Sequence, residues 1–72
     1  MKITPIHTKT ISSPIGELII TKGITPSGKE VTEFKELLNK KLSVRATIIK
    51  GGGSILEYFN EGKVTRKFIN KA

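Results

Sequence analysis

The stretch from Gly23 to Glu30 comes close to the phosphate-binding loop of nucleotide hydrolases. Its sequence, GITPSGKE, matches the pattern G-x-x-x-x-G-K-[ST] at every fixed position except the last. Glu30 stands where a hydroxyl residue should hold magnesium, and Pro26 removes one amide from the phosphate cradle. We therefore exclude nucleotide hydrolysis. Two readings remain: one phosphate bound by Gly28 and Lys29 at a helix N-terminus, or a capped helix start with an exposed lysine, which is favoured.

No other group of residues points to catalysis or metal binding. His7 is the single histidine, and residues 8–10 beside it offer no carboxylate to orient it. The chain has no cysteine and no aspartate. Glu30, Glu33 and Glu36 are interspersed with lysines, which is typical of a solvated surface. The sequence therefore predicts a protein that is not an enzyme, has no cofactor and no metal site, and turns His7 to solvent.

Basic residues are the strongest functional signal. Thirteen Lys and Arg against six Glu give a net charge of +7. Residues 1–39 hold five basic and four acidic residues (+1), whereas residues 40–72 hold eight and two (+6). This asymmetry predicts an acidic partner, either nucleic acid (DNA or RNA) or an acidic protein surface. The alternative is a lysine-rich surface that only keeps a small domain in solution.

Six residues of the C-terminal half form the predicted nucleic-acid interface. In the last strand Lys63 and Lys67 are expected to share one face, while Arg66 points the other way. If a helix covers the apolar side of the sheet, the open side would present Arg45, Lys63 and Lys67, with Tyr58 offering a ring for stacking. Phosphate contacts of this kind weaken as salt rises. The predicted nucleic-acid-binding residues are Arg45, Lys50, Tyr58, Lys63, Arg66 and Lys67.

A hairpin and a helix are predicted in the N-terminal half of the chain, ahead of these residues. Strands are expected over residues 2–11 and 17–22, and Pro5 confines the first to a sheet edge. Ser27 and Glu30 then have the spacing of a capping box. A helix is predicted after them, because apolar residues follow at intervals of three and four: Val31, Phe34, Leu37, Leu38 and Leu42.

Three more strands are predicted over residues 43–50, 55–60 and 64–69. Residues 60–63, Asn-Glu-Gly-Lys, predict a type I turn with Gly62 in the left-handed conformation. The expected fold is therefore α+β, a small antiparallel sheet with one helix packed on a face, in the order ββαβββ.

Length and composition predict one small domain over residues 1–72. The absence of cysteine excludes disulfides and fits a reducing compartment. Residues 1–11 carry charge and turn residues where a signal peptide needs an apolar core, and no apolar run approaches the length of a membrane span. We therefore expect a cytoplasmic protein without a membrane partner.

Two stretches resemble known families in outline. Residues 7–22, with the core SPIGEL, resemble the opening hairpin of methylated-DNA cysteine methyltransferases, which implies a hairpin but not their activity, since the chain has no cysteine. Residues 27–31, SGKEV, with the later Gly53-Ser54 pair, are similar in outline to HicA-type messenger-RNA interferases. That family has a catalytic histidine where this chain has Ile55. The resemblance therefore implies RNA binding without cleavage.

The sequence as a whole predicts a binding module that contacts nucleic acid through a C-terminal basic sheet face. The alternative is a protein-interaction module, such as a small inhibitor or adaptor from a phage or mobile element, which could use its exposed strand edges for pairing. Formation of a homodimer is left open.

Overall fold

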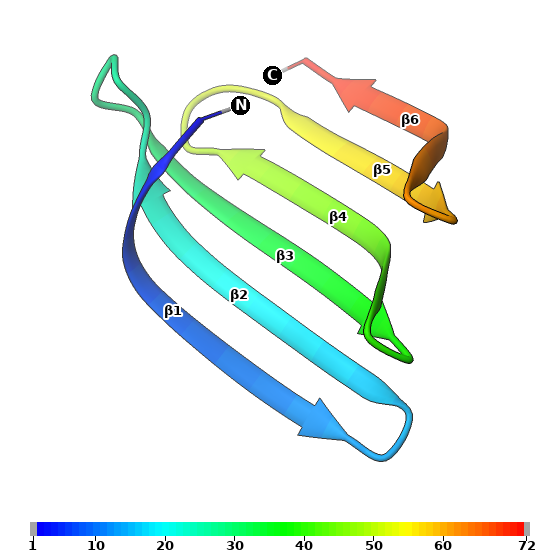
Figure 1. The fold of residues 1–72 in the computed structure, drawn as a ribbon. Coiled ribbons are helices and arrows are strands. Elements are labelled where there is room, and N and C mark those ends of the chain that lie inside the picture. The colour runs from blue at the N-terminus through cyan, green and yellow to red at the C-terminus, as the bar shows by residue number, and fades with distance from the viewer. Residues whose placement is uncertain (1, 72) are drawn as a thin grey trace.

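Six strands follow one another along the chain and pair in the same order in a computed structural model that describes residues 2–71 (Figure 1). Every neighbouring pair is antiparallel, so the sheet is a simple meander. Residues 2–71 contain no helix. The strands are β1 (Thr4–Ser13), β2 (Gly16–Ile24), β3 (Glu30–Leu38), β4 (Lys41–Ile49), β5 (Ser54–Asn60) and β6 (Lys63–Asn70).

The predicted α+β fold is wrong, because the residues of the expected helix form strand β3 and the turn into β4. The strand predictions are confirmed: the first two strands form a hairpin, and β4, β5 and β6 form the expected meander. The missing helix also removes the layout on which the likeness to HicA-type interferases rested. Every strand apart from the two edges has a partner on both sides, and the sheet forms a single layer.

Strand pairing overrides the helical spacing of the apolar residues in β3. Val31, Thr32 and Phe34 have side chains that favour strands. Glutamate and lysine favour helices, but intrinsic helix propensity is small and is overridden by tertiary pairing. In the structure Val31 pairs with Ile49 and Phe34 pairs with Ala46, while β2 pairs along the other side of β3. A central strand forms backbone hydrogen bonds and buries side chains against both neighbouring strands. A helix packed on this sheet would bury less of the same residues.

Two of the turns are two-residue loops with both central residues left-handed. Asn39 and Lys40 have φ values of 53° and 64°, and Glu61 and Gly62 have φ values of 53° and 79°. Positive φ at both central positions defines the type I′ hairpin turn, whose twist matches that of the flanking strands. Gly62 is left-handed as predicted, but the predicted type I turn is wrong because Glu61 is left-handed too.

The turn between β4 and β5 needs its three glycines. Gly51 has a φ of 72°, which a residue with a side chain adopts at a cost. A Cβ atom on Gly53 would lie 2.1 Å from the carbonyl oxygen of Asn70, so only glycine allows β6 to approach here. The turn is closed by hydrogen bonds in which the Ile49 amide donates to the Gly53 carbonyl and the Gly52 amide donates to the Ile49 carbonyl, both at 3.0 Å.

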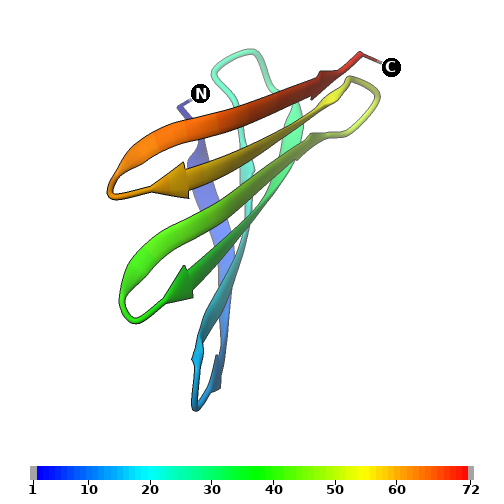
Figure 2. The ribbon, with the colours of Figure 1, turned by 90° about the vertical axis from the view of Figure 1, so that its right-hand side faces the viewer.

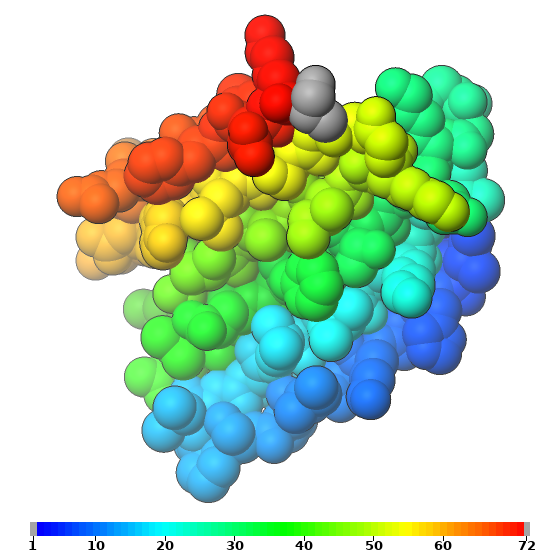
Figure 3. All heavy atoms as spheres, turned by 180° about the vertical axis from the view of Figure 1, so that it is seen from behind, coloured from blue at the N-terminus to red at the C-terminus, as the bar shows by residue number. Residues whose placement is uncertain are grey.

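The sheet is strongly twisted and has two different faces. Figure 2 shows β4 to β6 running at a steep angle to β1 and β2. We call the face toward the viewer in Figure 1 the inner face. The N-terminal residues cross in front of this face, and Ile3 lies against Gly23 there. The inner face carries the most buried side chains, Val31 (2% exposed), Thr47 and Glu57. We call the opposite one the outer face; Figure 3 views the molecule from that side.

Candidate binding face

The outer face carries a row of apolar side chains that crosses five strands. Directly paired residues on neighbouring strands lie side by side on the same face, so the pairing register defines such rows. The row begins at Lys9 on β1 and then contains only apolar residues. Its members, from β1 to β6, are Lys9, Ile20, Phe34, Ala46, Leu56 and Phe68.

A second outer row adds an aromatic and basic group at the β5–β6 end. Tyr58 pairs with Arg66 across these strands, and its ring stands edge to face with that of Phe68, with centroids 6.2 Å apart. Tyr58 is 39% exposed and Phe68 is 53% exposed, so both rings are open to a partner. The row consists of Ile11, Leu18, Glu36, Val44, Tyr58 and Arg66.

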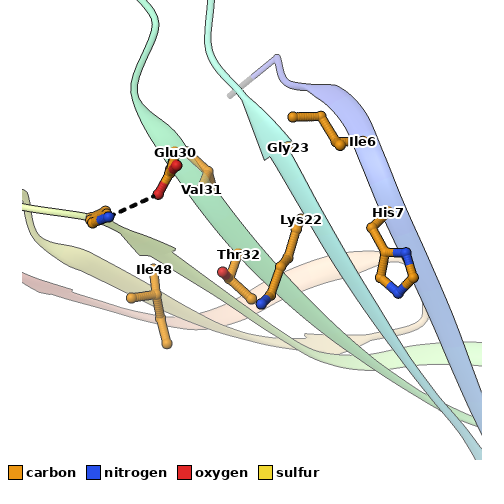
Figure 4. Close-up of a pocket in the computed structure, with 9 residues that line it drawn as sticks. Ile6, His7, Lys22, Gly23, Glu30, Val31, Thr32 and Ile48 are labelled. Carbon is orange, nitrogen blue, oxygen red and sulfur yellow. Dashed lines mark ion pairs between the residues drawn. The ribbon is translucent and has the colours of Figure 1, made fainter.

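A third, mostly polar row borders a hollow at the other end of the outer face. The row consists of His7, Lys22, Thr32, Ile48, Ser54 and Asn70. The hollow has a volume of about 530 Å³, and His7, Lys22, Thr32 and Ile48 line it together with Ile6 (Figure 4). Glu30 and Lys50 also border it and form an ion pair of 3.2 Å. His7 is exposed, as predicted.

The inner face also carries charged side chains, and two ion pairs join four of them. One of its rows contains Thr10, Ile19, Lys35, Arg45, Glu57 and Lys67. The Glu57 carboxylate, only 9% exposed, accepts from Nε of Arg45 at 2.9 Å and lies 2.8 Å from its Nη2. The guanidinium also lies 5.3 Å from the centre of the Phe59 ring. These contacts hold Arg45 in place and neutralise it.

The structure therefore separates the six predicted nucleic-acid-binding residues. Arg45 and Lys67 lie on the inner face, and Arg45 is occupied by Glu57. Lys50 follows the end of β4 and pairs with Glu30 beside the hollow, at the other end of the outer face. The remaining three, Tyr58, Lys63 and Arg66, lie together on the outer face. The expected surface of Arg45, Lys63 and Lys67 on one open face does not form.

A bulge in β6 explains why Lys63 changes sides. Tyr58 pairs with Arg66 but Phe59 pairs with Val64, so Thr65 is an extra residue in the strand. The Thr65 hydroxyl donates to the Tyr58 carbonyl at 3.3 Å. Simple alternation placed Lys63 with Lys67, whereas one inserted residue moves Lys63 to the face of Arg66.

The stretch resembling a phosphate loop has no free cradle. It forms the connection between β2 and β3, and no helix follows it. The Gly28 amide donates to the Thr25 carbonyl at 2.9 Å, and the Lys29 amide donates to the Thr25 hydroxyl at 3.1 Å. Both amides are therefore occupied, and the readings of a phosphate site or a capped helix start are wrong.

Sequence reasoning missed several members of the outer face. The spacing of apolar residues predicts a helix at Phe34, and the basic C-terminal half does not include Lys9 and Lys22. Their signal is present in the alternation of β1 and β2, where Lys9 and Ile11 share a side, as do Leu18, Ile20 and Lys22. Reading that alternation across all six strands would have found the face, but only with the meander order already known.

Comparisons with known proteins add no family to this geometry. No protein-family model matches the chain, and no curated protein or solved structure is similar to it at a significant level. Over residues 2–71 no cluster of three or more histidines, cysteines or acidic residues is placed to hold a metal ion. Within the same range, no helix could cross a membrane.

Proposed function

We propose that this chain is a protein-binding module that packs its outer face against a partner protein. The observation that carries the proposal is the uncovered apolar row on the outer face. Charged residues such as Glu57 lie on the more buried inner face, whereas the apolar row from Ile20 to Phe68 lies on the outer face without a covering layer. A sheet normally buries its apolar face against another layer, so an uncovered one is a contact surface.

The exposed area supports the same proposal. The chain has an accessible surface of 5524 Å² and a mass of 7.9 kDa. A folded monomer of that mass exposes about 4,400 Å². The excess of roughly 1,100 Å² exceeds the share of about 800 Å² that each partner contributes to a standard protein interface. A partner layer on one face of this single-layer sheet would bring the chain close to the exposure of an ordinary small domain.

Adjacent residues on β6 provide a matched test. Phe68 is 53% exposed on the outer face, and Ile69 is 61% exposed on the inner face. A pulldown from nuclease-treated lysate of the source cells should return one stoichiometric protein with the native chain. Phe68→Glu should abolish its capture and Ile69→Glu should not, with equal thermal unfolding of both variants as the control. Equal capture by the two variants, or only nuclease-sensitive material, would contradict the proposal.

The aromatic and basic group on β5 and β6 favours a second candidate, the binding of single-stranded nucleic acid. Tyr58 and Phe68 present exposed rings, and Lys63 and Arg66 lie beside them on the same face. Stacking of a base on an aromatic side chain contributes about 1–3 kcal/mol, and nearby cations bind the phosphates. This candidate keeps the function predicted from the sequence and three of its six residues, Tyr58, Lys63 and Arg66, and adds Phe68.

Its test is the binding of a labelled oligo-dT and a labelled oligo-U at about 50 and 200 mM salt. Tyr58→Ala should weaken binding about 5- to 150-fold, the equivalent of one stacked base. Lys63→Ala should reduce the salt dependence by about one phosphate contact, while Lys67→Ala on the inner face should leave it unchanged. Failure to bind either oligonucleotide at low salt would remove the candidate.

A further inference from the structure

The net charge of the sheet lies almost entirely on the outer face. The inner face holds three cations and three glutamates: Lys35, Arg45, Lys67, Glu17, Glu33 and Glu57. The outer face holds six cations and two glutamates, a charge of +4: Lys9, Lys22, Lys41, Lys50, Lys63, Arg66, Glu30 and Glu36. In the sequence the excess positive charge lies in the C-terminal half, and in the folded sheet it lies on the outer face.

Most of the outer cations have no acidic partner. On the inner face Lys35 pairs with Glu33 at 3.3 Å and Arg45 pairs with Glu57. Of the outer cations only Lys50 has an ion pair among the described residues. The other five are available to a partner: Lys9, Lys22, Lys41, Lys63 and Arg66.

These cations surround the apolar row. Lys9 ends the row on β1, and Lys22 and Arg66 flank it in the two neighbouring rows. From Ile20 on β2 to Phe68 on β6 the apolar part crosses four strand spacings, about 19 Å at about 4.8 Å each. A partner that matches this surface needs an apolar stripe of similar length with negative charge beside it.

We infer that the outer face binds an acidic amphipathic protein segment, which would lay apolar side chains on the row and carboxylates on the surrounding lysines and Arg66. This inference rests on the proposed protein-binding function and names the chemistry of its partner. A helix of about 13 residues covers the same 19 Å. The hollow beside Ile6 and Ile48, at the end of the face, receives a bulky apolar side chain of the segment (Figure 4).

A second copy of the chain fits this surface less well. Two outer faces brought together would oppose +4 with +4, and Glu30 is already occupied by Lys50. Like charges placed against each other across an interface cost several kcal/mol. Nucleic acid would supply negative charge but not an apolar stripe for Ile20, Ala46 and Leu56. Charge and hydrophobicity together favour the acidic segment.

The test uses three synthetic peptides of about 14 residues that differ only beside their leucine face. One carries glutamates there, one carries glutamines and one carries lysines. We expect the glutamate peptide to bind the full chain at least about tenfold more tightly than the glutamine peptide, with affinity falling as salt rises. The lysine peptide should not bind detectably. Backbone amide shifts in NMR spectra should map the glutamate peptide to the outer face.

Charge reversal supplies the matched controls. The double variant Lys63→Glu and Arg66→Glu should weaken the glutamate peptide and allow the lysine peptide to bind. Lys67→Glu, on the inner face of the same strand, should leave both affinities unchanged. Phe68→Glu should abolish binding of the glutamate and glutamine peptides, because it removes the apolar end of the row.

Each contrary outcome has a distinct meaning. Equal affinity for the glutamate and glutamine peptides, or no binding of either at about 1 mM, overturns the acidic partner. The proposed function then still stands if the pulldown depends on Phe68. A dimer in sedimentation that Phe68→Glu dissociates replaces the acidic segment with a second copy. Oligo-dT and unlabelled glutamate peptide can each displace a labelled glutamate peptide. If oligo-dT does so at the lower concentration, the face is assigned to nucleic acid instead.

Discussion

Arg45 and Glu57 lie opposite each other on β4 and β5, and Nε and Nη2 of the guanidinium both contact the same carboxylate oxygen, Oε1. The pair occupies the centre of the inner face, where the Glu57 side chain is 9% exposed and the Arg45 side chain is 33% exposed. A carboxylate buried to this degree requires its partner, because desolvation disfavours the charge. The pair therefore contributes to the stability of the sheet and is not available for binding.

Arg45→Ala should destabilise the fold by about 2–4 kcal/mol, because it leaves the Glu57 carboxylate buried without a counter-charge. Urea unfolding of the native chain and the variant measures the difference. Lys35→Ala is the matched control, since Lys35 pairs with Glu33 at a more exposed position on the neighbouring strand. Its effect should stay within about 1 kcal/mol. Equal losses for the two variants would contradict the structural role assigned to Arg45.

Val31→Ala should cost roughly 2 kcal/mol, because Val31 is 2% exposed and its two methyl groups would leave a cavity on the inner face. Val64→Ala makes the same chemical change at a position that is 46% exposed, and it should cost no more than about 1 kcal/mol. The comparison by urea unfolding removes the difference in strand preference between valine and alanine. A larger loss at Val64 would mean that the core does not lie beside β3.

Gly53→Ala should destabilise the sheet by roughly 1–3 kcal/mol, because the added Cβ would meet the Asn70 carbonyl oxygen at the start of the β5–β6 pairing. Gly28→Ala serves as the comparison. Gly28 has a φ of 88° but no atom within 4 Å of an added Cβ, so only the backbone conformation is penalised, by about 1 kcal/mol. Hydrogen exchange should show loss of protection in β6 for Gly53→Ala and not for Gly28→Ala.

The sequence allowed every strand except β3 to be predicted. β1, β2, β5 and β6 contain β-branched residues bounded by Pro, Ser and Gly, which are strong local signals. Between them, Val31, Phe34, Leu37 and Leu38 satisfy a helical spacing as well as a strand, and short apolar patterns do not separate the two. Pairing with β2 and β4 determines that these residues form a strand, and this pairing involves residues distant in the sequence.

The candidate face was predictable only in part, for a related reason. Two-residue alternation correctly separates Tyr58 from Phe59 and Arg66 from Lys67. The sequence predicts Tyr58 on the face of Arg45 and Lys67, however, and this is wrong because Tyr58 pairs with Arg66 on the opposite face. Lys63 was misplaced because the bulge at Thr65 carries no sequence signal that alternation detects. Lys9 and Lys22 joined the face only through the meander order, which brings the N-terminal hairpin beside β3.

Lys40→Gly distinguishes the hairpin of β3 and β4 from the helix that the sequence predicts. Lys40 has a φ of 64° in a two-residue turn after Asn39, and Asn-Gly is the pair that this turn prefers. The hairpin therefore predicts stabilisation by about 0.5–1 kcal/mol, since glycine adopts the left-handed conformation without steric cost. In a helix over these residues glycine would instead destabilise by about 1 kcal/mol. Urea unfolding gives the sign of the change, and a loss of stability would argue that Asn39 and Lys40 do not form this turn.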